Sequence, residues 1–365
     1  VYTPVDELNV TMVYKIDSTQ IGEEIELSAQ ADDETKFLIP LAEETLSADW
    51  DQSQEDELHE IVLTVKDKAD NSVSQTFSFK AKFDVPTLTI NSLNIDSTAN
   101  IYSWANGTKG SLLESCTTDE NGSCTVRLYE DSATLLIEVL DGKYRELATG
   151  TLVPLSEEDI LQAVFNYDQV DTQVTVTPIT HIAAGLAANM VADGFNASTA
   201  ADNANATISD LYGIDILDDI PFDISDNSNA VDEVDDNLEY SIILAGISSW
   251  TNDYATDNGY QNQYEYHSVL FAQIAAEDIA ADGLLNGGVN FGDTELDQSV
   301  YRNGIADSMI EVVNGNRNNS TQDISDLISY IASISSSTDS LYDNEPVQPL
   351  DDQAPVIAAS NFESG

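Results

Sequence analysis

The sequence predicts a multidomain α+β protein, with two N-terminal β-sandwich domains followed by an all-helical domain. Its 365 residues are more than one hydrophobic core usually organises. Short runs of alternating apolar and polar residues, separated by turn residues, continue as far as Pro154, and apolar residues recur at helical spacing after it. We therefore expect β-sandwiches over 1–85 and 86–154, an all-α domain over 155–343 and a linker over 344–365.

The first domain, residues 1–85, is predicted from short alternating strands with polar turns between them. These strands are Leu8–Tyr14, Ile25–Ala29, Lys36–Ile39, Ile61–Val65 and Ser74–Phe83. The stretch from Ile61 to Phe79 resembles the closing hairpin of bacterial Ig-like repeats, in which a strand enters an Asp-x-x-Gly-Asn turn. Asp70 stands in place of the usual glycine. The resemblance implies an Ig-like module.

The second domain, residues 86–154, has four expected strands. They are Ser92–Ile95, Asn100–Trp104, Cys124–Leu128 and Thr134–Val139. The Thr-Asp-x-x-Gly turn at 118–122 and the later Gly-Lys-Tyr at 142–144 resemble a transthyretin-like, or carboxypeptidase-regulatory-like, sandwich. The resemblance implies a spacer or binding accessory.

Helical periodicity dominates after Pro154. The expected helices are Glu157–Tyr167, Ile179–Ala192, Ser198–Tyr212, Val231–Tyr254, Tyr266–Ala281, Leu296–Val313 and Ile324–Ser335. Thr177 is placed to cap a helix that begins at Pro178, and Asp323 precedes Ile324 in the same way. The segment 176–180, Val-Thr-Pro-Ile-Thr, resembles an element that follows such β modules in bacterial surface proteins.

The tail from Asn344 onward is rich in proline, as linkers are. Its end resembles the first strand of another Ig-like repeat, so we expect the natural protein to continue beyond Gly365. Val1 is not followed by the basic and apolar regions of a signal peptide. We therefore interpret the chain as a mature or excised fragment.

The negative charge of the chain limits the classes of partner that it can bind. Asp and Glu number 66 against 12 Lys and Arg, a formal charge of −54. Nucleic acid is excluded, because a polyanion releases no counterions from a phosphate backbone. No apolar run reaches the roughly 20 residues of a membrane helix, so no membrane insertion is expected within this fragment. Such charge repels itself unless it is screened, which favours a saline or marine source or bound Ca²⁺.

Two acidic turns are candidate calcium sites, since Ca²⁺ prefers carboxylate and amide oxygens. One comprises Asp67, Asp70 and Asn71 in the first domain. The other comprises Asp278, Asp282 and Asn286 around a predicted helix end at Gly283, and it resembles an Asp-Gly-x-Leu-Asp-Gly element of bacterial surface proteins. A plain hairpin turn and a helix ended by glycine are the alternatives.

A third acidic segment is denser but less regular. It contains Asp215, Asp218, Asp219, Asp223, Asp226, Asp232, Asp235 and Asp236. The spacing differs from that of an EF-hand, which needs glycine at the sixth position and glutamate at the twelfth. A cation site and a solvated loop both remain open.

Cys116 and Cys124 are predicted to form a disulfide. Asn121-Gly122 between them is a turn dipeptide, and a hairpin around it would bring the two sulfurs together. A disulfide implies an oxidising compartment. Two buried thiols are the alternative.

No catalytic motif is present. The histidines at 59, 181 and 267 have no metal-binding spacing, and neither a Gly-x-Ser-x-Gly elbow nor a phosphate loop occurs. We therefore expect no enzyme activity, with His181 as a helix N-terminal packing residue.

The leading functional hypothesis is a segment of a bacterial adhesin-like protein, extracellular or on the surface of a Gram-negative cell. It would bind a glycan, a protein or another copy of itself. Trp250, Tyr254, Tyr260 and Tyr264 are the candidate ligand-binding aromatics, with helix packing as their alternative role. The rival hypothesis is an accessory region of a secreted hydrolase whose catalytic domain lies outside this fragment.

Overall fold

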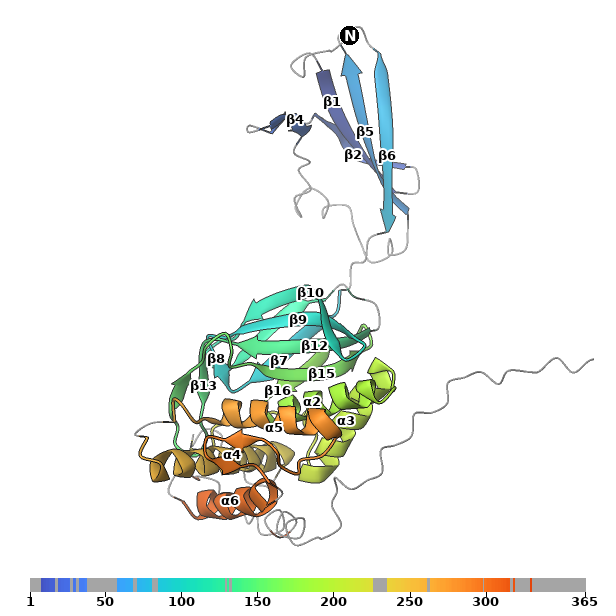
Figure 1. Ribbon diagram of the computed structural model, residues 1–365. Coiled ribbons are helices and arrows are strands. Elements are labelled where there is room, and N and C mark those ends of the chain that lie inside the picture. Colours follow the sequence, from blue (N-terminus) through green and yellow to red (C-terminus); the bar gives the residue numbers. More distant parts are fainter. Residues whose placement is uncertain are drawn as a thin grey trace, which may run out of the picture. The chain divides into compact units, whose positions relative to one another are not determined.

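The computed structural model describes residues 8–16, 19–26, 29–30, 33–37, 58–67, 71–80, 85–128, 130, 133–225, 235–260, 263–297, 299–315, 318 and 329. The chain divides into two compact units, Val1–Val85 and Pro86–Gly365. Strands in several sheets and a group of helices confirm the mixed α+β class (Figure 1).

The first unit contains an antiparallel sheet in the order β2-β1-β5-β6 and a separate β3-β4 hairpin. Its strands are β1 (Leu8–Ile16), β2 (Thr19–Glu26), β3 (Ala29–Gln30), β4 (Asp33–Phe37), β5 (Leu58–Asp67) and β6 (Ser72–Lys80). The central register pairs Met12 with Leu63 and Tyr14 with Ile61. The expected Ig-like identity of this unit stays a prediction, and residues 38–57 lie outside the described part.

The second unit begins with three small sheets. Their orders are β10-β9-β12-β15, β11-β7-β16 and β14-β13-β8. The strands are β7 (Thr87–Ser92), β8 (Asn94–Ile95), β9 (Thr98–Ala105), β10 (Thr108–Thr117), β11 (Ser123–Arg127), β12 (Ala133–Leu140), β13 (Lys143–Arg145), β14 (Leu152–Pro154), β15 (Leu161–Tyr167) and β16 (Thr172–Val176).

The two larger sheets share one hydrophobic core. Leu88 and Ile90 alternate with partly exposed threonines along β7, and both are fully buried. Ile101 of β9 and Ile137 of β12 lie opposite each other in the other sheet and join the same core. The period of two therefore buries one side-chain row of β7, whereas residues 135–139 of β12 are buried on both faces of their sheet.

A helix over Glu157–Tyr167 was expected, and this prediction is wrong. Strand β15 covers Leu161–Tyr167 instead, with Leu161, Ala163 and Phe165 buried. Val164 and Phe165 pair with Leu136 and Leu135 of β12. A short apolar run is compatible with both the helical period and the strand period. This segment forms a strand because it pairs with the edge of β12 that β9 leaves free.

The domain boundary expected near residue 154 therefore differs from the structure. Strands β15 and β16 complete the two sheets after that point, and the core continues from them into the helices without a break. Residues from Pro86 onward form one compact unit rather than a sandwich followed by a separate helical domain.

Among the described residues, the helices begin at Pro178. They are α2 (Pro178–Ala192), α3 (Ala197–Tyr212), α4 (Asp236–Asp257), α5 (Ser268–Asp282), a π-helix over Val300–Gly304 and α6 (Ile305–Asn314). A two-strand hairpin, β17 (Asn290–Phe291) with β18 (Thr294–Glu295), precedes the π-helix. The predicted cap is confirmed: the Thr177 hydroxyl accepts hydrogen bonds from the backbone N of Ile179 and Thr180. The helix expected at Ile324–Ser335 lies almost wholly outside the described residues.

Small residues let the helices approach closely. A Cβ added to Gly185 of α2 would lie 2.5 Å from the carbonyl oxygen of Ala276 in α5, and one added to Gly246 of α4 would lie 2.4 Å from Met309 Cγ in α6. In Figure 1, α2 and α5 lie next to the sandwich, and α6 lies beyond α4.

Helices and loops cover the edge strands on one side of the sandwich. The Thr180 hydroxyl of α2 donates to the Gln162 carbonyl of β15 at 2.9 Å, and the Asn205 amide of α3 donates to the Val164 carbonyl at 2.8 Å. The backbone N of Thr175 in β16 donates to the Leu217 carbonyl at 2.8 Å. These contacts satisfy backbone groups that an open edge would expose.

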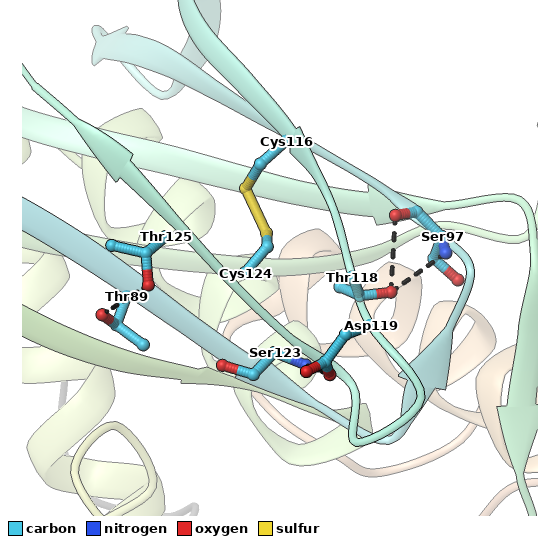
Figure 2. The surroundings of a disulfide bond; sticks show 8 residues. All are labelled: Thr89, Ser97, Cys116, Thr118, Asp119, Ser123, Cys124 and Thr125. Atoms are coloured by element: carbon cyan, nitrogen blue, oxygen red, sulfur yellow. Dashed lines mark hydrogen bonds between the residues drawn. A yellow bond between two sulfur atoms is a disulfide. The ribbon is translucent and has the colours of Figure 1, made fainter.

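The predicted disulfide between Cys116 and Cys124 is present (Figure 2), with the two Cα atoms 6.1 Å apart. The hairpin expected around it is wrong. Strand β10 pairs with β9, and β11 pairs with β7, so the chain crosses from one sheet to the other between them. The disulfide therefore joins the two sheets.

Candidate functional site

A cavity of about 610 Å³ lies beside α3 in the second unit. Strands β15 and β16 and the turn between them form one side, α3 forms another, and the turn at 215–218 contributes the rest. Its lining residues are Phe165, Asn166, Asp168, Thr172, Gln173, Val174, Ser198, Asp202, Asn205, Ala206, Ser209, Asp215, Leu217 and Asp218. Small-molecule sites commonly have this size.

The turn at 215–218 is held by side-chain capping of its own backbone. Asp215 Oδ1 accepts hydrogen bonds from the backbone N of Leu217 and of Asp218, both at 3.1 Å. Asp219 Oδ2 accepts from the backbone N of Asp215 at 2.7 Å. Aspartate forms such local bonds readily. The acidic segment noted in the sequence is thus an ordered turn in this part.

The helical side of the cavity is fixed by α3. Asn196 caps this helix by accepting from the Thr199 backbone N, and Gly213 ends it in a left-handed conformation with φ of 71°. Asn166 of β15 donates to Asp202 Oδ1 at 2.7 Å and to the Ser198 carbonyl at 3.1 Å. A polar hydrogen bond therefore crosses between strand and helix in the cavity wall.

The lining carries four aspartates and no Lys, Arg or His. Burial raises the pKa of Asp218, and the negative charge of Asp215 raises it further. Burial also raises the pKa of the neighbouring Asp219, with additional repulsion from Asp236, Asp215 and Asp218. A cation bound in the cavity would relieve this repulsion, whereas an anion would increase it.

The predicted aromatic residues fall into two groups. Trp250 and Tyr254 of α4 pack among other rings, with the Trp250 centroid 5.5 Å from that of Phe271 and 5.4 Å from that of Phe291. Tyr254 OH also accepts a hydrogen bond from the backbone N of Asp293. Helix packing, the alternative role, describes these two residues.

Tyr260 and Tyr264 follow α4 and reach the surface, with exposed fractions of 36% and 49%. The Tyr260 ring lies 4.8 Å from the Tyr266 ring. Neither tyrosine lines the acidic cavity. Their role in ligand binding stays a prediction.

The Asp278, Asp282 and Asn286 group forms a loop held by hydrogen bonds. Asp278 Oδ2 accepts from the backbone N of Gly287 and from Tyr301 OH, and Asn286 Nδ2 donates to Asp282 Oδ2 at 3.0 Å. The predicted end of α5 at Gly283 is confirmed. These oxygens thus have partners from the chain itself.

Of the other calcium candidate, Asp70 lies outside the described residues, and Asn71 is exposed just before β6. Within the described part of the chain, no group of three or more His, Cys, Asp or Glu side chains could hold a metal ion. Calcium binding stays a prediction.

His181 and His267 have structural positions. His181 in the first turn of α2 is buried, its Nδ1 has no hydrogen-bond partner among the described atoms, and burial lowers its pKa to about 4. His267 caps α5 by accepting from the Leu270 backbone N. Its Nε2 lies 3.6 Å from Asp159 Oδ1. The absence of enzyme activity stays a prediction.

Comparison with known proteins gives two structural matches of low similarity and no family. Comparison with protein families finds no match, and comparison with curated proteins finds none. Among solved structures, the chain is similar to BcpA, the major pilin subunit of Bacillus cereus, at 11% identity and a TM-score of 0.19. That match covers 47% of this chain and 60% of the pilin chain, and a variant of the same pilin matches at 48% and 60%. A likeness this low does not establish a shared fold.

No described helix is both long and apolar enough to cross a membrane.

Part of the cavity is evident in the sequence, since Asp215 and Asp218 belong to the acidic segment. Asp168, Asp202 and Asn166 were not expected there, because a turn, a helix and a strand that lie apart in the sequence supply them. Asp202 and Asn205 lie one helical turn apart, and this spacing was the available sign of a polar face on α3.

Proposed function

We propose that the chain is a non-catalytic segment of a bacterial cell-surface or secreted adhesin-like protein, acting as a spacer and a binding module. The acidic cavity beside α3 carries the binding part of this proposal. Its ligand is the protonated amine or guanidinium group of a glycan or protein partner.

The chemistry of the lining supports a cationic ligand. Asp168, Asp202, Asp215 and Asp218 supply carboxylates, and the amides and hydroxyls around them accept further hydrogen bonds. Hydrogen bonds to charged groups are stronger than neutral ones, so an ammonium or guanidinium group gains most from such a lining. The net charge of −54 also steers cations toward the protein.

The disulfide supports a location outside the cytoplasm. Cys116 and Cys124 are bonded, and no free cysteine remains in the chain. Disulfides persist in oxidising environments such as the periplasm and the cell surface.

Calcium stabilisation is part of the proposal. Its support is a group of crowded carboxylates: burial raises the pKa of Asp218, Asp219 and Glu239, and repulsion from neighbouring aspartates raises it further. Cations that bind only the folded state would stabilise it by mass action.

Titration by nuclear magnetic resonance tests the binding site. D-glucosamine and N-acetyl-D-glucosamine form a matched pair, because acetylation removes the positive charge and keeps the sugar ring. We expect the charged sugar to shift the signals of residues that line the cavity, and the shifts to weaken with added salt. Equal effects of both sugars would contradict recognition by charge.

Two variants locate the interaction. Asp218→Asn removes one carboxylate of the cavity and should weaken glucosamine binding. Asp307→Asn removes an exposed carboxylate of α6, outside the cavity, and should leave binding unchanged. Equal loss in both would assign the binding to the general negative charge of the molecule.

A further inference from the structure

Strands β7 and β16 are the first and last strands of the sandwich in the second unit. β7 is the first strand of the sandwich, reached directly from Pro86, and β16 is the last, leading through Thr177 into α2. The two strands are neighbours and pair in parallel, from Leu88 with Thr172 to Ser92 with Val176. The chain therefore enters and leaves the sandwich through two adjacent strands that run in the same direction.

This arrangement decides how tension along the chain would act. Tension from the N-terminal side pulls β7 at its first residue, Thr87. Tension from the C-terminal side reaches the sandwich at Val176, the last residue of β16, however many helices detach before it. The first residue of one parallel strand and the last residue of its neighbour lie at opposite ends of the pair. The two strands are thus pulled past each other along their length.

In this geometry the hydrogen bonds between the strands share the tension and must break together. A hairpin pulled at its open end instead loses its bonds one after another. Forced unfolding depends on the height of the unfolding barrier, so the shared geometry lengthens the lifetime of the fold under tension.

Other contacts hold β7 in place. It is the central strand of its sheet and pairs with β11 on its other side, from Thr87 with Arg127 to Asn91 with Ser123. Asp171, in the turn before β16, accepts hydrogen bonds from the backbone N and the hydroxyl of Thr87, at 2.8 and 2.9 Å. Leu88 and Ile90 are fully buried in the core.

The disulfide anchors the other neighbour of β7. Cys124 lies in β11 and is bonded to Cys116 of β10, which belongs to the opposite sheet. The side chains of Thr89 and Thr125 share a hydrogen bond of 3.0 Å next to this link (Figure 2). Strand β11 therefore cannot leave with β7 without displacing the second sheet.

We propose that the parallel pair β7 and β16 is a mechanical clamp that holds the sandwich together when the chain is stretched. The inference rests on the spacer role proposed above and adds that the spacer works under tension. It does not involve the ligand of the acidic cavity, so binding and mechanical resistance can fail separately.

Single-molecule force spectroscopy on the full chain tests the clamp. The chain is pulled from its two ends, and the event that opens the sandwich is identified with a reductant. The disulfide closes a loop with a sequence separation of 8. Reduction should therefore lengthen the released chain by roughly 2 nm in that event alone.

A second attachment geometry is the control. Arg127 pairs with Thr87, so a handle at nearby Glu130 lies beside the start of β7. Pulling between the N-terminus and residue 130 separates β7 from β11 one bond at a time. We expect a several-fold lower force for the sandwich event in this geometry. Equal forces in the two geometries would overturn the clamp.

Two matched variants refine the test. Asp171→Ala removes the two hydrogen bonds to Thr87 and should lower the rupture force in end-to-end pulling. Asp119 likewise accepts bonds from two backbone N atoms, those of Asn121 and Ser123, but it lies inside the loop that the disulfide shields. Asp119→Ala should leave the rupture force unchanged under oxidising conditions. An effect of Asp119→Ala as large as that of Asp171→Ala would also overturn the clamp.

Discussion

The Glu146 carboxylate accepts hydrogen bonds from both the backbone N and the hydroxyl of Ser268, at 2.8 and 2.6 Å, across 122 residues of sequence. Glu146 follows β13 and is fully buried, and Ser268 is the first residue of α5. A carboxylate at a helix N-terminus satisfies backbone N–H groups that have no partner in the helix. Burial nevertheless raises the pKa of Glu146. Glu146 thus attaches α5 to the sandwich, in addition to the bonds that α2 and α3 make to β15.

Replacing this carboxylate should be costly. Glu146→Ala leaves the buried backbone N and hydroxyl of Ser268 without their partner, which should lower the free energy of unfolding by about 2 to 4 kcal/mol. Glu158→Ala removes an exposed glutamate and should change it by less than about 0.5 kcal/mol. Urea denaturation monitored by circular dichroism measures both. A neutral result for Glu146→Ala would contradict the role of this contact.

His181 predicts a loss of stability in acid. Its pKa is about 4 in the folded protein, below the ordinary histidine value of 6.5, so the unfolded chain binds a proton first as pH falls. Its contribution to stability is complete above pH 6.5 and is lost as pH falls toward 4, by about 3 kcal/mol in total. Burial lowers the pKa of His267 as well, which acts in the same direction. Nuclear magnetic resonance titration of the histidine rings separates the two, and a His181 signal that titrates near 6.5 would contradict its burial.

Gly185→Ala tests the close packing of α2 on α5, because the sign of the change in stability depends on it. Alanine is favoured over glycine inside a helix by about 1 kcal/mol, so a helix without close neighbours would gain stability. The added Cβ would lie 2.5 Å from the Ala276 carbonyl oxygen, which forces α2 and α5 apart. We expect a lower melting temperature. A higher one would show that the two helices do not pack at this point.

The disulfide should add measurable stability. On the chain-entropy estimate, closing so short a loop contributes about 2.5 kcal/mol. Mass spectrometry of unreduced peptides should find Cys116 linked to Cys124. The double variant Cys116→Ser with Cys124→Ser should unfold at lower denaturant than the oxidised protein. Two thiols that react with an alkylating reagent in the native protein would contradict the bond.

Calcium should raise the melting temperature above that in chelator, because cations that bind only the folded state stabilise it. Sodium chloride at matched ionic strength is the control, since it screens the carboxylates without occupying specific sites. Calorimetric titration with calcium gives the number of sites. Identical melting curves in calcium and in chelator would remove calcium from the proposal.

The residues at the helix ends made the boundaries of two helices predictable. Thr177 and Pro178 predicted the start of α2, and Gly283 predicted the end of α5. Such ends can be read from the sequence because helix capping depends on the residues next to the helix. The strand β10 was missed. It lies at the edge of its sheet and carries mostly exposed polar residues, so it shows no apolar alternation.

Pairing over long distances was less predictable. Cys116 and Cys124 were matched correctly, but the hairpin between them was inferred from the Asn121-Gly122 turn alone. In the structure, the two strands that flank this turn belong to different sheets, because β10 pairs with β9 and β11 pairs with β7. The acidic cavity depends on the same kind of distant contact, since β15 and α3 meet only after folding.

The helices and the disulfide hold the sandwich at different strands. Helices α2 and α3 cover β15, and the turn at 215–218 covers β16, whereas the disulfide links β10 and β11 at the other margins of the same two sheets. Reduction should therefore loosen the fold from one side only. Amide hydrogens of β10 and β11 should then exchange with solvent faster, while those of β15 and β16 keep their protection.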